Sequence, residues 1–478
     1  FVEASKRLTL GTQIDTAQYP ALSLAFRDLT IARTGVLAMG DRVMEVGELH
    51  NAGVLLSSGQ LAINAQVALN EATGVIKAGS LKIETHSDFA NLGRILSETT
   101  LALLVEGTLR NDGSIGAAGA LELDAVSYVA NTAAAELVAA RTDILLSGSL
   151  RNAGLIAAAS GLTLRAGEDS RNEASGEIVA KAIEAKIAGD LANLGRLFSE
   201  TTLTATVSGL LANSGSIQAV GNLDLTVTDL VNSGLSAVIA SNGDVTIDAA
   251  RGITNTAGTL VSSKTLALSA DAALVNSGLL QGTEGLSVTA QTLDNRKGGR
   301  IYAGATRQTG SGLVATGTLS VHLSGNLSNL GQIVSADEAV LDAKGSLANG
   351  GSIEAGGDLR LEAYSYLPGS SAARLAARNL DLILGSSFTN EGVLAVAGRL
   401  GLDVKGDLVN AATGRIDAAL IEAEVAGGLT NLGDIFTPGT LQAVVGGLLT
   451  NEALIHAGAG LRAEAGGLVN RGAGAALK

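Results

Sequence analysis

The sequence lacks cysteine and tryptophan altogether, and it contains only 3 prolines among 478 residues. Without cysteine the chain forms no disulfides and offers no thiolate ligands to a metal. Aromatic residues make up 2% of the chain although 46% of it is hydrophobic, so its core must be built from aliphatic side chains. The scarcity of proline suits strands that are paired on both sides, because proline removes a backbone donor from a ladder.

Positive charge is also scarce, since 32 Lys and Arg residues stand against 46 Asp and Glu residues and give a formal net charge of −14. This balance, without any basic tract, argues against a nucleic-acid surface and against an anionic membrane as partner. No run of eighteen apolar residues occurs, so we expect no transmembrane helix. Residues 1–6 begin in mid-pattern rather than with a signal peptide, and we therefore expect an internal fragment of a longer protein.

What the chain does contain is an asparagine that returns at a nearly fixed interval. The step from Asn91 to Asn111 is typical; the step from Asn349 to Asn390 is twice as long, and the step from Asn295 to Asn329 is an interval plus an insertion. Fixed-period similarity over such a length indicates a repeat architecture. The series comprises Asn51, Asn70, Asn91, Asn111, Asn131, Asn152, Asn172, Asn193, Asn213, Asn232, Asn255, Asn276, Asn295, Asn329, Asn349, Asn390, Asn410, Asn431, Asn451 and Asn470.

Most of these asparagines belong to units of one design, for which residues 109–125 are an example, and a minority of units have a longer turn, Asn-x-x-x-Gly. An Asn-x-Gly turn is followed by a short apolar strand and then by a strand that alternates Leu-x-Leu-x-Ala. Asparagine and glycine suit the turn because both tolerate left-handed backbone angles. Alternation with period two places every second side chain on one face. Units of about 20 residues with two or three short strands predict an all-β fold, a right-handed parallel β-helix.

In such a β-helix the inward asparagines would form a ladder at one corner, each amide bonding to the amide of the next coil. Asn111 should then lie buried between Asn91 and Asn131, one coil away on either side. Asn64, by contrast, occupies an outward position on a strand and should contribute little.

We predict one continuous β-helix over residues 1–478, with a less regular start at 1–47 and an inserted surface loop at 304–318. A longer period is superimposed on the first, and the block 88–234 recurs as 326–472. Adding 238 to Asn91, Asn111, Asn152, Asn172, Asn193, Asn213 and Asn232 gives Asn329, Asn349, Asn390, Asn410, Asn431, Asn451 and Asn470. Duplication of whole multi-coil blocks fits a shaft whose length can vary, and it fits poorly with one unique active site.

Units of the form Leu-x-Asn-x-Gly-x-Ile-x-Ala-x-Gly-x-Leu-x-Leu-x-Ala resemble the repeats of filamentous haemagglutinins and of CdiA-type contact-dependent growth inhibition proteins. The resemblance covers about residues 47–478. It implies a right-handed parallel β-helix that forms the non-catalytic stalk of a secreted protein at the surface of a Gram-negative bacterium. It further implies export by an outer-membrane two-partner secretion transporter of the Omp85 type. The stalk would serve adhesion, or would hold a receptor-binding region or a C-terminal toxin toward neighbouring cells.

Some features of that family are missing from this sequence. It contains no Asn-Pro-Asn motif of the secretion domain, no Val-Glu-Asn-Asn boundary of a toxin module and no Arg-Gly-Asp tripeptide. The secretion signal, the receptor-binding site and any toxin activity are therefore assigned to no residue of this chain. The expected partners are the transporter and a host or bacterial surface receptor or polysaccharide, and we expect no cofactor and no metal.

A β-helical polysaccharide lyase or hydrolase, or another carbohydrate-binding β-helix, is the alternative hypothesis. Such an enzyme would present a column of carboxylates on adjacent coils. The four histidines, at positions 50, 86, 322 and 456, lie many coils apart, and no spacing indicates a Ser-His-carboxylate triad. The outward position of the Leu-x-Leu strands is mixed, as expected of a solvated face, and reads Glu122, Thr163, Asp224, Thr246, Ala267, Ser287, Arg360 and Gly401.

Two departures from the repeat are candidates for a contact surface. Tyr364 and Tyr366, followed by Pro368, interrupt the asparagine register, and two exposed tyrosines would form a contact patch. A local bulge is the simpler interpretation of the same residues. The inserted loop at 304–318 is the second candidate, because loops often carry binding residues.

Overall fold

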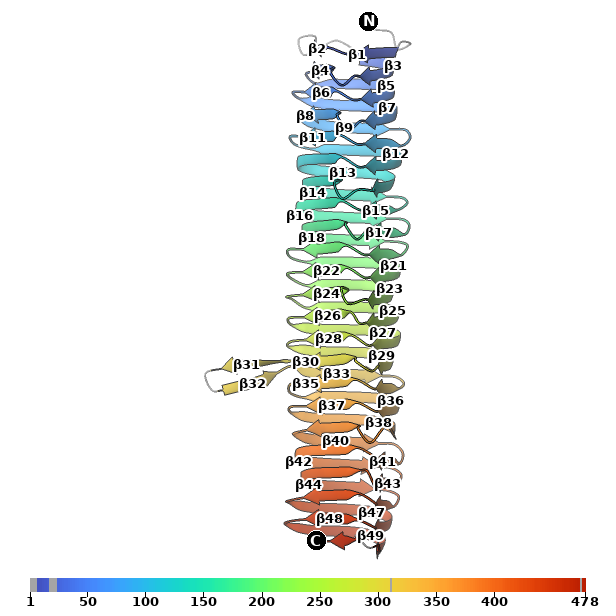
Figure 1. Cartoon of the computed structure of the whole chain (residues 1–478), viewed down its shortest axis with the longest axis vertical. Helices are drawn as coiled ribbons and strands as arrows, with labels where there is room; N and C mark the ends of the chain where they lie inside the picture. Colours follow the sequence, from blue (N-terminus) through green and yellow to red (C-terminus); the bar gives the residue numbers. More distant parts are fainter. Residues whose placement is uncertain (1–6, 17–23, 310–311, 473–474) are drawn as a thin grey trace. The chain divides into compact units, whose positions relative to one another are not determined.

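The computed structural model describes residues 7–16, 24–309, 312–472 and 475–478, and the chain divides into two compact units, residues 1–228 and 229–478. In each unit, short parallel strands are stacked in successive coils (Figure 1). The described residues contain strands and turns but no α-helix, and hence no helix long and apolar enough to cross a membrane. The predicted fold class, an all-β parallel β-helix with about 20 residues per coil, is confirmed.

The strands of the first unit are β1 (Arg7–Leu10), β2 (Gln13–Asp15), β3 (Leu24–Ile31), β4 (Val36–Met39), β5 (Arg42–Asn51), β6 (Val54–Ser57), β7 (Gln60–Asn70), β8 (Val75–Ala78), β9 (Ser80–Thr85), β10 (Phe89–Asn91), β11 (Arg94–Ser97), β12 (Leu101–Asn111), β13 (Ser114–Ala130), β14 (Glu136–Leu146), β15 (Leu150–Asn152), β16 (Leu155–Ala166), β17 (Ser170–Asn172), β18 (Glu177–Ile187), β19 (Leu191–Asn193), β20 (Arg196–Ser199), β21 (Leu203–Asn213) and β22 (Ser216–Ala219). The boundary between the two units, after Thr228, falls within strand β23 (Leu223–Ser233).

The strands of the second unit are β24 (Val238–Ser241), β25 (Val245–Thr256), β26 (Thr259–Ser262), β27 (Thr265–Asn276), β28 (Leu279–Gly282), β29 (Gly285–Asn295), β30 (Arg300–Ala303), β31 (Ala305–Thr309), β32 (Gly312–Thr316), β33 (Thr318–Leu323), β34 (Leu327–Asn329), β35 (Gln332–Ser335), β36 (Ala339–Asn349), β37 (Ser352–Ala355), β38 (Asp358–Pro368), β39 (Arg374–Ala377), β40 (Asn379–Leu384), β41 (Phe388–Asn390), β42 (Val393–Val404), β43 (Leu408–Asn410), β44 (Arg415–Val425), β45 (Leu429–Asn431), β46 (Asp434–Thr437), β47 (Thr440–Asn451), β48 (Leu454–Ala457), β49 (Gly460–Asn470) and β50 (Ala476–Leu477).

A coil has three faces, as residues 94–111 illustrate. Strand β11 lies on face A, residues 101–105 of β12 lie on face B, and residues 109–111, which end in the repeat asparagine, lie on face C. Along each strand buried and more exposed side chains alternate. The period of two that the sequence shows therefore separates the inside of the coil from its outside.

The core consists of aliphatic columns that run from coil to coil. On face A, Ile95 lies between Ile76 and Ile115 of the adjacent coils, and all three are fully buried. On face B, Leu101 lies in the same way between Leu81 and Leu121. Burial of one such side chain contributes about 1.5–3 kcal/mol. Because each side chain contacts only the coils above and below, the stabilisation is local.

Parallel stacking is already present in the N-terminal segment that was expected to be less regular. Strand β3 pairs with β5 from Leu24 opposite Met44 to Ile31 opposite Asn51, so that residues 24–47 already belong to paired coils. Met44 and Ile31 are fully buried, like the aliphatic residues of later coils. Residues 24–47, which belong to the predicted less regular start, thus share the parallel pairing of the later coils. Residues 1–6 and 17–23 lie outside the described parts.

The insertion at 304–318 is a β-hairpin rather than a loop. Strands β31 and β32 pair antiparallel, with Ala305 opposite Thr316, and Figure 1 shows them standing out from the wall beside β30 and β33. The glycines at its root, Gly304 and Gly317, have φ angles of +119° and +122°. A methyl group added to Gly317 would lie 2.1 Å from the Cα atom of Gly304. Only glycine therefore allows the two backbone segments at the root of the hairpin to lie so close together.

Candidate functional site

The asparagine corner is the most regular polar feature of both units. Asn91 is placed by β10, and its Nδ2 donates to Oδ1 of Asn111 at 2.8 Å and to the carbonyl oxygen of Ser114 at 3.4 Å. Its own Oδ1 accepts from Nδ2 of Asn70 at 2.7 Å. The Asn91 amide thus connects three successive coils while satisfying its own buried polar atoms. Such a chain of bonds stabilises the corner because an unpaired buried amide would be costly.

Eighteen of the twenty repeat asparagines are buried. In the first unit, amide-to-amide bonds of 2.7–3.0 Å join Asn51, Asn70, Asn91 and Asn111 in one run and Asn152, Asn172, Asn193 and Asn213 in another. In the second unit, bonds of 2.8–2.9 Å join Asn232, Asn255, Asn276, Asn295, Asn329 and Asn349 in one run and Asn390, Asn410, Asn431, Asn451 and Asn470 in another. Asn470, the last of these, is exposed.

Asn131 does not continue the ladder, and that prediction is wrong. Its side chain is exposed, and Ala130 takes the register position opposite Asn152. The place of the missing amide is filled by Tyr128, which occupies the leucine position of the Leu-x-Asn strand and is fully buried. Its hydroxyl lies 3.2 Å from Nδ2 of Asn111. A long side chain two residues earlier thus reaches the site that the small Ala130 leaves open.

The second unit repeats this substitution at the matching place of the duplicated block. Tyr366 occupies the position opposite Leu347, and its hydroxyl lies 3.4 Å from Nδ2 of Asn349. It packs edge-on against Phe388 with ring centroids 5.3 Å apart. The predicted exposed pair of tyrosines is therefore wrong for Tyr366, which is buried, whereas Tyr364 points outward and is 63% exposed. Burial raises the pKa of both Tyr128 and Tyr366, because the charged phenolate would be desolvated.

The histidines take part in separate surface contacts. His50 pairs with Glu71, and His86 lies 3.1 Å from Oε1 of Glu106 and 3.0 Å from Oδ1 of Asn64. Asn64 thus lies at an outward position of β7, as predicted, and its amide oxygen takes part in this surface contact. Among the described residues, no group of three or more His, Asp or Glu side chains is arranged to hold a metal.

Face B carries the column that a polysaccharide-cleaving enzyme would use, and in the second unit its carboxylates are paired with cations. Arg399 lies over Gly401 and bridges Asp381 and Glu422 of the adjacent coils, with Nη1 3.2 Å from Oε2 of Glu422. A side chain at position 401 would meet this guanidinium, because a methyl group there would lie 2.7 Å from Nη1. Partial burial acts to lower the pKa of Arg399, but the two carboxylates outweigh it and raise that pKa. These three side chains are partly exposed and form ion pairs with one another on the surface of face B.

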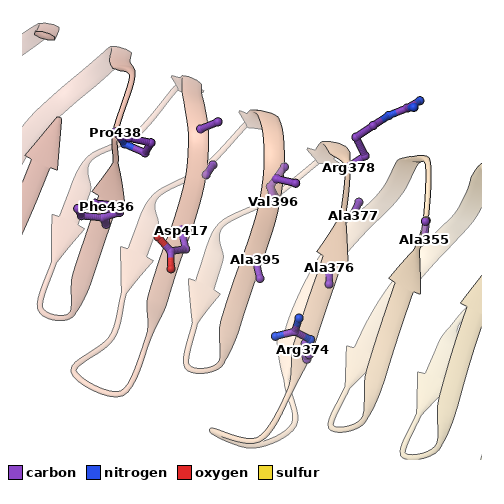
Figure 2. A pocket seen from close by; sticks show the side chains of 14 residues that line it. Ala355, Arg374, Ala376, Ala377, Arg378, Ala395, Val396, Asp417, Phe436 and Pro438 are labelled. Atoms are coloured by element: carbon purple, nitrogen blue, oxygen red, sulfur yellow. The ribbon is translucent and has the colours of Figure 1, made fainter. Parts of the chain in front are cut away.

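Face A of the second unit is hollowed, as Figure 2 shows. The hollow has a volume of about 750 Å³ and opens where two successive coils place alanine outward, at Ala376 and Ala395. Arg374 stands at one end and Phe436 at the other. The ring of Phe436 is stacked on that of His456, with centroids 5.0 Å apart and an interplanar angle of 7°. The hollow is a broad depression of the wall rather than an enclosed cavity.

A family model, the haemagglutinin repeat, matches the chain eight times, over residues 27–85, 78–137, 129–183, 178–247, 240–331, 314–363, 371–421 and 411–478. The chain belongs to the haemagglutinin repeat family. No curated protein and no solved structure matches it. The predicted resemblance to filamentous haemagglutinin repeats is thereby confirmed. Each match spans more than two coils, so a haemagglutinin repeat is a stack of coils and not a single one.

Sequence reasoning located the asparagine corner of these haemagglutinin repeats and the break in register at Tyr366, but it did not predict that Tyr128 and Tyr366 are buried and take the place of an asparagine. Tyr128 and Tyr366 each stand two residues before the register position of the ladder, which Ala130 and Pro368 occupy, and this position follows from the strand pairing. The hollow on face A was also missed. It depends on small residues in adjacent coils, which become neighbours only when the coil register is known.

Proposed function

We propose that the chain is a segment of the non-catalytic filamentous stalk of a large two-partner secretion exoprotein at the surface of a Gram-negative bacterium. The stalk presents an adhesive or receptor-binding region, or a C-terminal toxin, to neighbouring cells. The strongest support is the likeness of the two duplicated blocks of haemagglutinin repeats. Both blocks have the same coil register, and in both a tyrosine interrupts the asparagine ladder, at 128 and at 366. Repeats that differ mainly in number supply length, whereas a catalytic site needs one unique arrangement of side chains.

The physical basis of the proposed role is that every coil is held only by its neighbours. Backbone ladders, aliphatic columns and asparagine bonds all run parallel to the stack in each unit. A coil can therefore be added or removed without disturbing distant parts. The charge of −14 adds mutual repulsion between chains, which favours solubility outside the cell.

A seamless deletion tests this role. Removal of residues 92–193 joins Asn91 to Leu194-Gly195-Arg196, which repeats the native Leu92-Gly93-Arg94, and it removes five coils of the first unit. The new neighbours β8 and β20 share the register of β8 and β11. In the exoprotein that contains this chain, we expect export and cell attachment to persist, with the presented region closer to the cell.

The matched control removes residues 92–182, which is nearly as long but ends in mid-coil. Because it deletes the face A strand and joins Asn91 to a face B strand, we expect it to misfold and to be degraded. Loss of attachment in the seamless variant, despite normal surface display, would contradict the stalk role for this segment. The enzyme hypothesis makes a different prediction: cleavage of polyuronides by the purified chain, abolished by substitution of one surface carboxylate. The paired state of Asp381 and Glu422 does not favour it.

Adhesion and toxin presentation differ in what the stalk carries. The sequence that follows Lys478 in the complete gene distinguishes them. A toxin domain with an adjacent immunity gene would assign the stalk to contact-dependent inhibition, and a further run of repeats with no such domain would assign it to adhesion.

A further inference from the structure

Face A of the two units carries opposite charges at matched positions. In the first unit, outward side chains of three adjacent coils form the column Glu136, Leu155, Glu177. The residues at the matching places of the duplicated block form the column Arg374, Val393, Arg415 on face A of the second unit. In both columns an aliphatic residue therefore lies between two side chains of like charge, but the sign of the charge is reversed.

These side chains are accessible. Glu136, Glu177, Arg374 and Arg415 are exposed, while Leu155 and Val393 are partly covered. Exposed pairs of this kind contribute little, so their side chains can exchange partners at small cost. Their bonds within the chain run to side chains beside them: Glu136 accepts from Ser114 at 3.0 Å, Glu177 lies 3.9 Å from Arg196, Arg374 lies 3.2 Å from Glu354, and Nε of Arg415 lies 3.1 Å from Asp417.

The shapes of the two faces also differ at matched positions. Beside the glutamate column, the first unit carries the outward aliphatic residues Val138 and Val179, the former 38% exposed. Beside the arginine column, the second unit carries Ala376 at the place of Val138 and Asp417 at the place of Val179, while Ala395 matches another alanine, Ala157. Ala376 and Ala395 form the floor of the hollow in Figure 2. The first face thus offers the projecting side chain of Val138, and the second has a smaller residue, Ala376, at the matched place.

We propose that face A of the first unit of one copy docks on face A of the second unit of another copy. The aliphatic residues Leu155 and Val393 meet at the centre, and Glu136 and Glu177 pair with Arg374 and Arg415. Because both columns are symmetric about their aliphatic residue, the charges match whether the two coil stacks run parallel or antiparallel. Docking of two first units would instead place glutamates against glutamates, and docking of two second units would place arginines against arginines.

This contact is independent of what the stalk presents. Three coils span only about 10 Å along the stack, so the docked area falls in the range of weak, transient interfaces. Glu354 and Asp417 beside the arginines further reduce the attraction. We therefore expect concentration-dependent association that weakens as salt is added. Because the two docking faces are different, each associated pair keeps one free face of each kind, and association can continue to longer assemblies.

Sedimentation velocity of the full chain over a concentration series, at low salt, tests the proposal. The double variants E136R/E177R and R374E/R415E should each lose association, by about tenfold or more, since attraction becomes repulsion at two positions. An equimolar mixture of the two variants should associate again, because each supplies the face that the other lacks. Restoration on mixing cannot come from misfolded chains.

The control is E122R/E184R, which makes the same change of net charge on face B of the first unit and should associate like the unchanged chain. Three results would overturn the proposal: an unchanged chain that stays monomeric at every concentration, variants that associate as well as the unchanged chain, or a mixture that fails to recover. A chain whose association depends on Glu122 and Glu184 would have its contact on face B instead.

Discussion

The hydroxyl of Tyr128 lies 3.2 Å from the amide nitrogen of Asn111, in the place where the next asparagine of the ladder would stand. The same Asn111 nitrogen donates to the carbonyl oxygen of Glu136 at 2.9 Å. Tyr366 stands in the same relation to Asn349 in the second unit, at 3.4 Å. A tyrosine therefore ends an asparagine run at corresponding positions of both blocks, and it satisfies the last amide of the run.

We predict that Tyr128→Phe destabilises its coil by about 0.5–1.5 kcal/mol, the usual net contribution of one buried hydrogen bond. The Asn111 amide keeps its bond to Glu136, so the loss is not larger. Tyr366→Phe should cost less, because its hydroxyl is farther from the amide. Hydrogen exchange of the backbone amides around residues 109–130 measures the effect. Tyr364→Phe is the control, since that side chain is exposed, and an equal loss there would contradict the assignment.

Alkaline pH should destabilise the same coil. Burial raises the pKa of Tyr128 in the folded chain, whereas in the unfolded chain it stays near the ordinary value of about 10. The stabilisation is complete below the unfolded pKa and is lost as pH rises above it, because only the unfolded chain then releases the proton. Between about pH 9 and about pH 11, on either side of that ordinary pKa, the stability of the unchanged chain should fall more than that of Tyr128→Phe. Thermal unfolding at both pH values measures this difference, and equal slopes would show that Tyr128 ionises freely.

Asn111→Leu tests the ladder itself. It removes the bonds to Asn91 and Tyr128 and leaves the buried amide nitrogen of Asn91 without its amide acceptor, which should cost about 1–3 kcal/mol. We expect a protease-sensitive site at this coil while distant coils stay protected, because the damage passes only to neighbours. Asn131→Leu is the matched control, an exposed repeat asparagine that should be nearly silent. Equal protection of both variants in hydrogen exchange would mean that the asparagines only form turns.

Substitution of one buried threonine should increase the stability of its coil, in contrast to the substitutions above. Thr142 lies on face B between Leu121 and Leu162 of the adjacent coils, and its hydroxyl is buried without a hydrogen-bond partner in the described part of the chain. The duplicated block has leucine at the same place, Leu380. Thr142→Val removes the unpaired hydroxyl at almost unchanged volume and should stabilise the coil by about 1–2 kcal/mol. Thr204→Val, at an outward position of β21, should have no such effect, and hydrogen exchange compares the two.

The period of the sequence was sufficient to predict the coil, its strands and the asparagine corner, because local alternation and turn residues agree with the stacking in every unit. It was insufficient where the register changes without a change in period. Asn131 keeps the interval of the repeat yet lies outside, because Ala130 and Tyr128 together replace one inward asparagine. The charge reversal between Glu136 and Arg374 is visible in the sequence only after the two blocks have been aligned. That both residues lie on face A is known only after the strands have been placed.

Removal of the hairpin should leave the solenoid of the second unit intact. The bond between Asn295 and Asn329 is formed at 2.8 Å although 34 residues separate them, so the ladder already closes across the insertion. Deleting residues 305–316 makes the sequence separation between Asn295 and Asn329 smaller than that between Asn232 and Asn255. Those two asparagines form the same amide-to-amide bond in a coil without an insertion. It joins Gly304 directly to Gly317, whose backbones already touch at the hairpin root.

We expect this deletion variant to keep the circular dichroism, thermal stability and exchange protection of the unchanged chain, because loop closure at the root needs almost no rearrangement. Gly317→Ala in the intact chain provides the contrast. An alanine there would combine a φ of +122° with a methyl group 2.1 Å from the Cα atom of Gly304, so the strands on either side must separate. Loss of protection at β30 and β33 is the expected result. If the deletion destabilised these strands as much as Gly317→Ala does, the hairpin itself would contribute to the stability of the coil, contrary to the prediction.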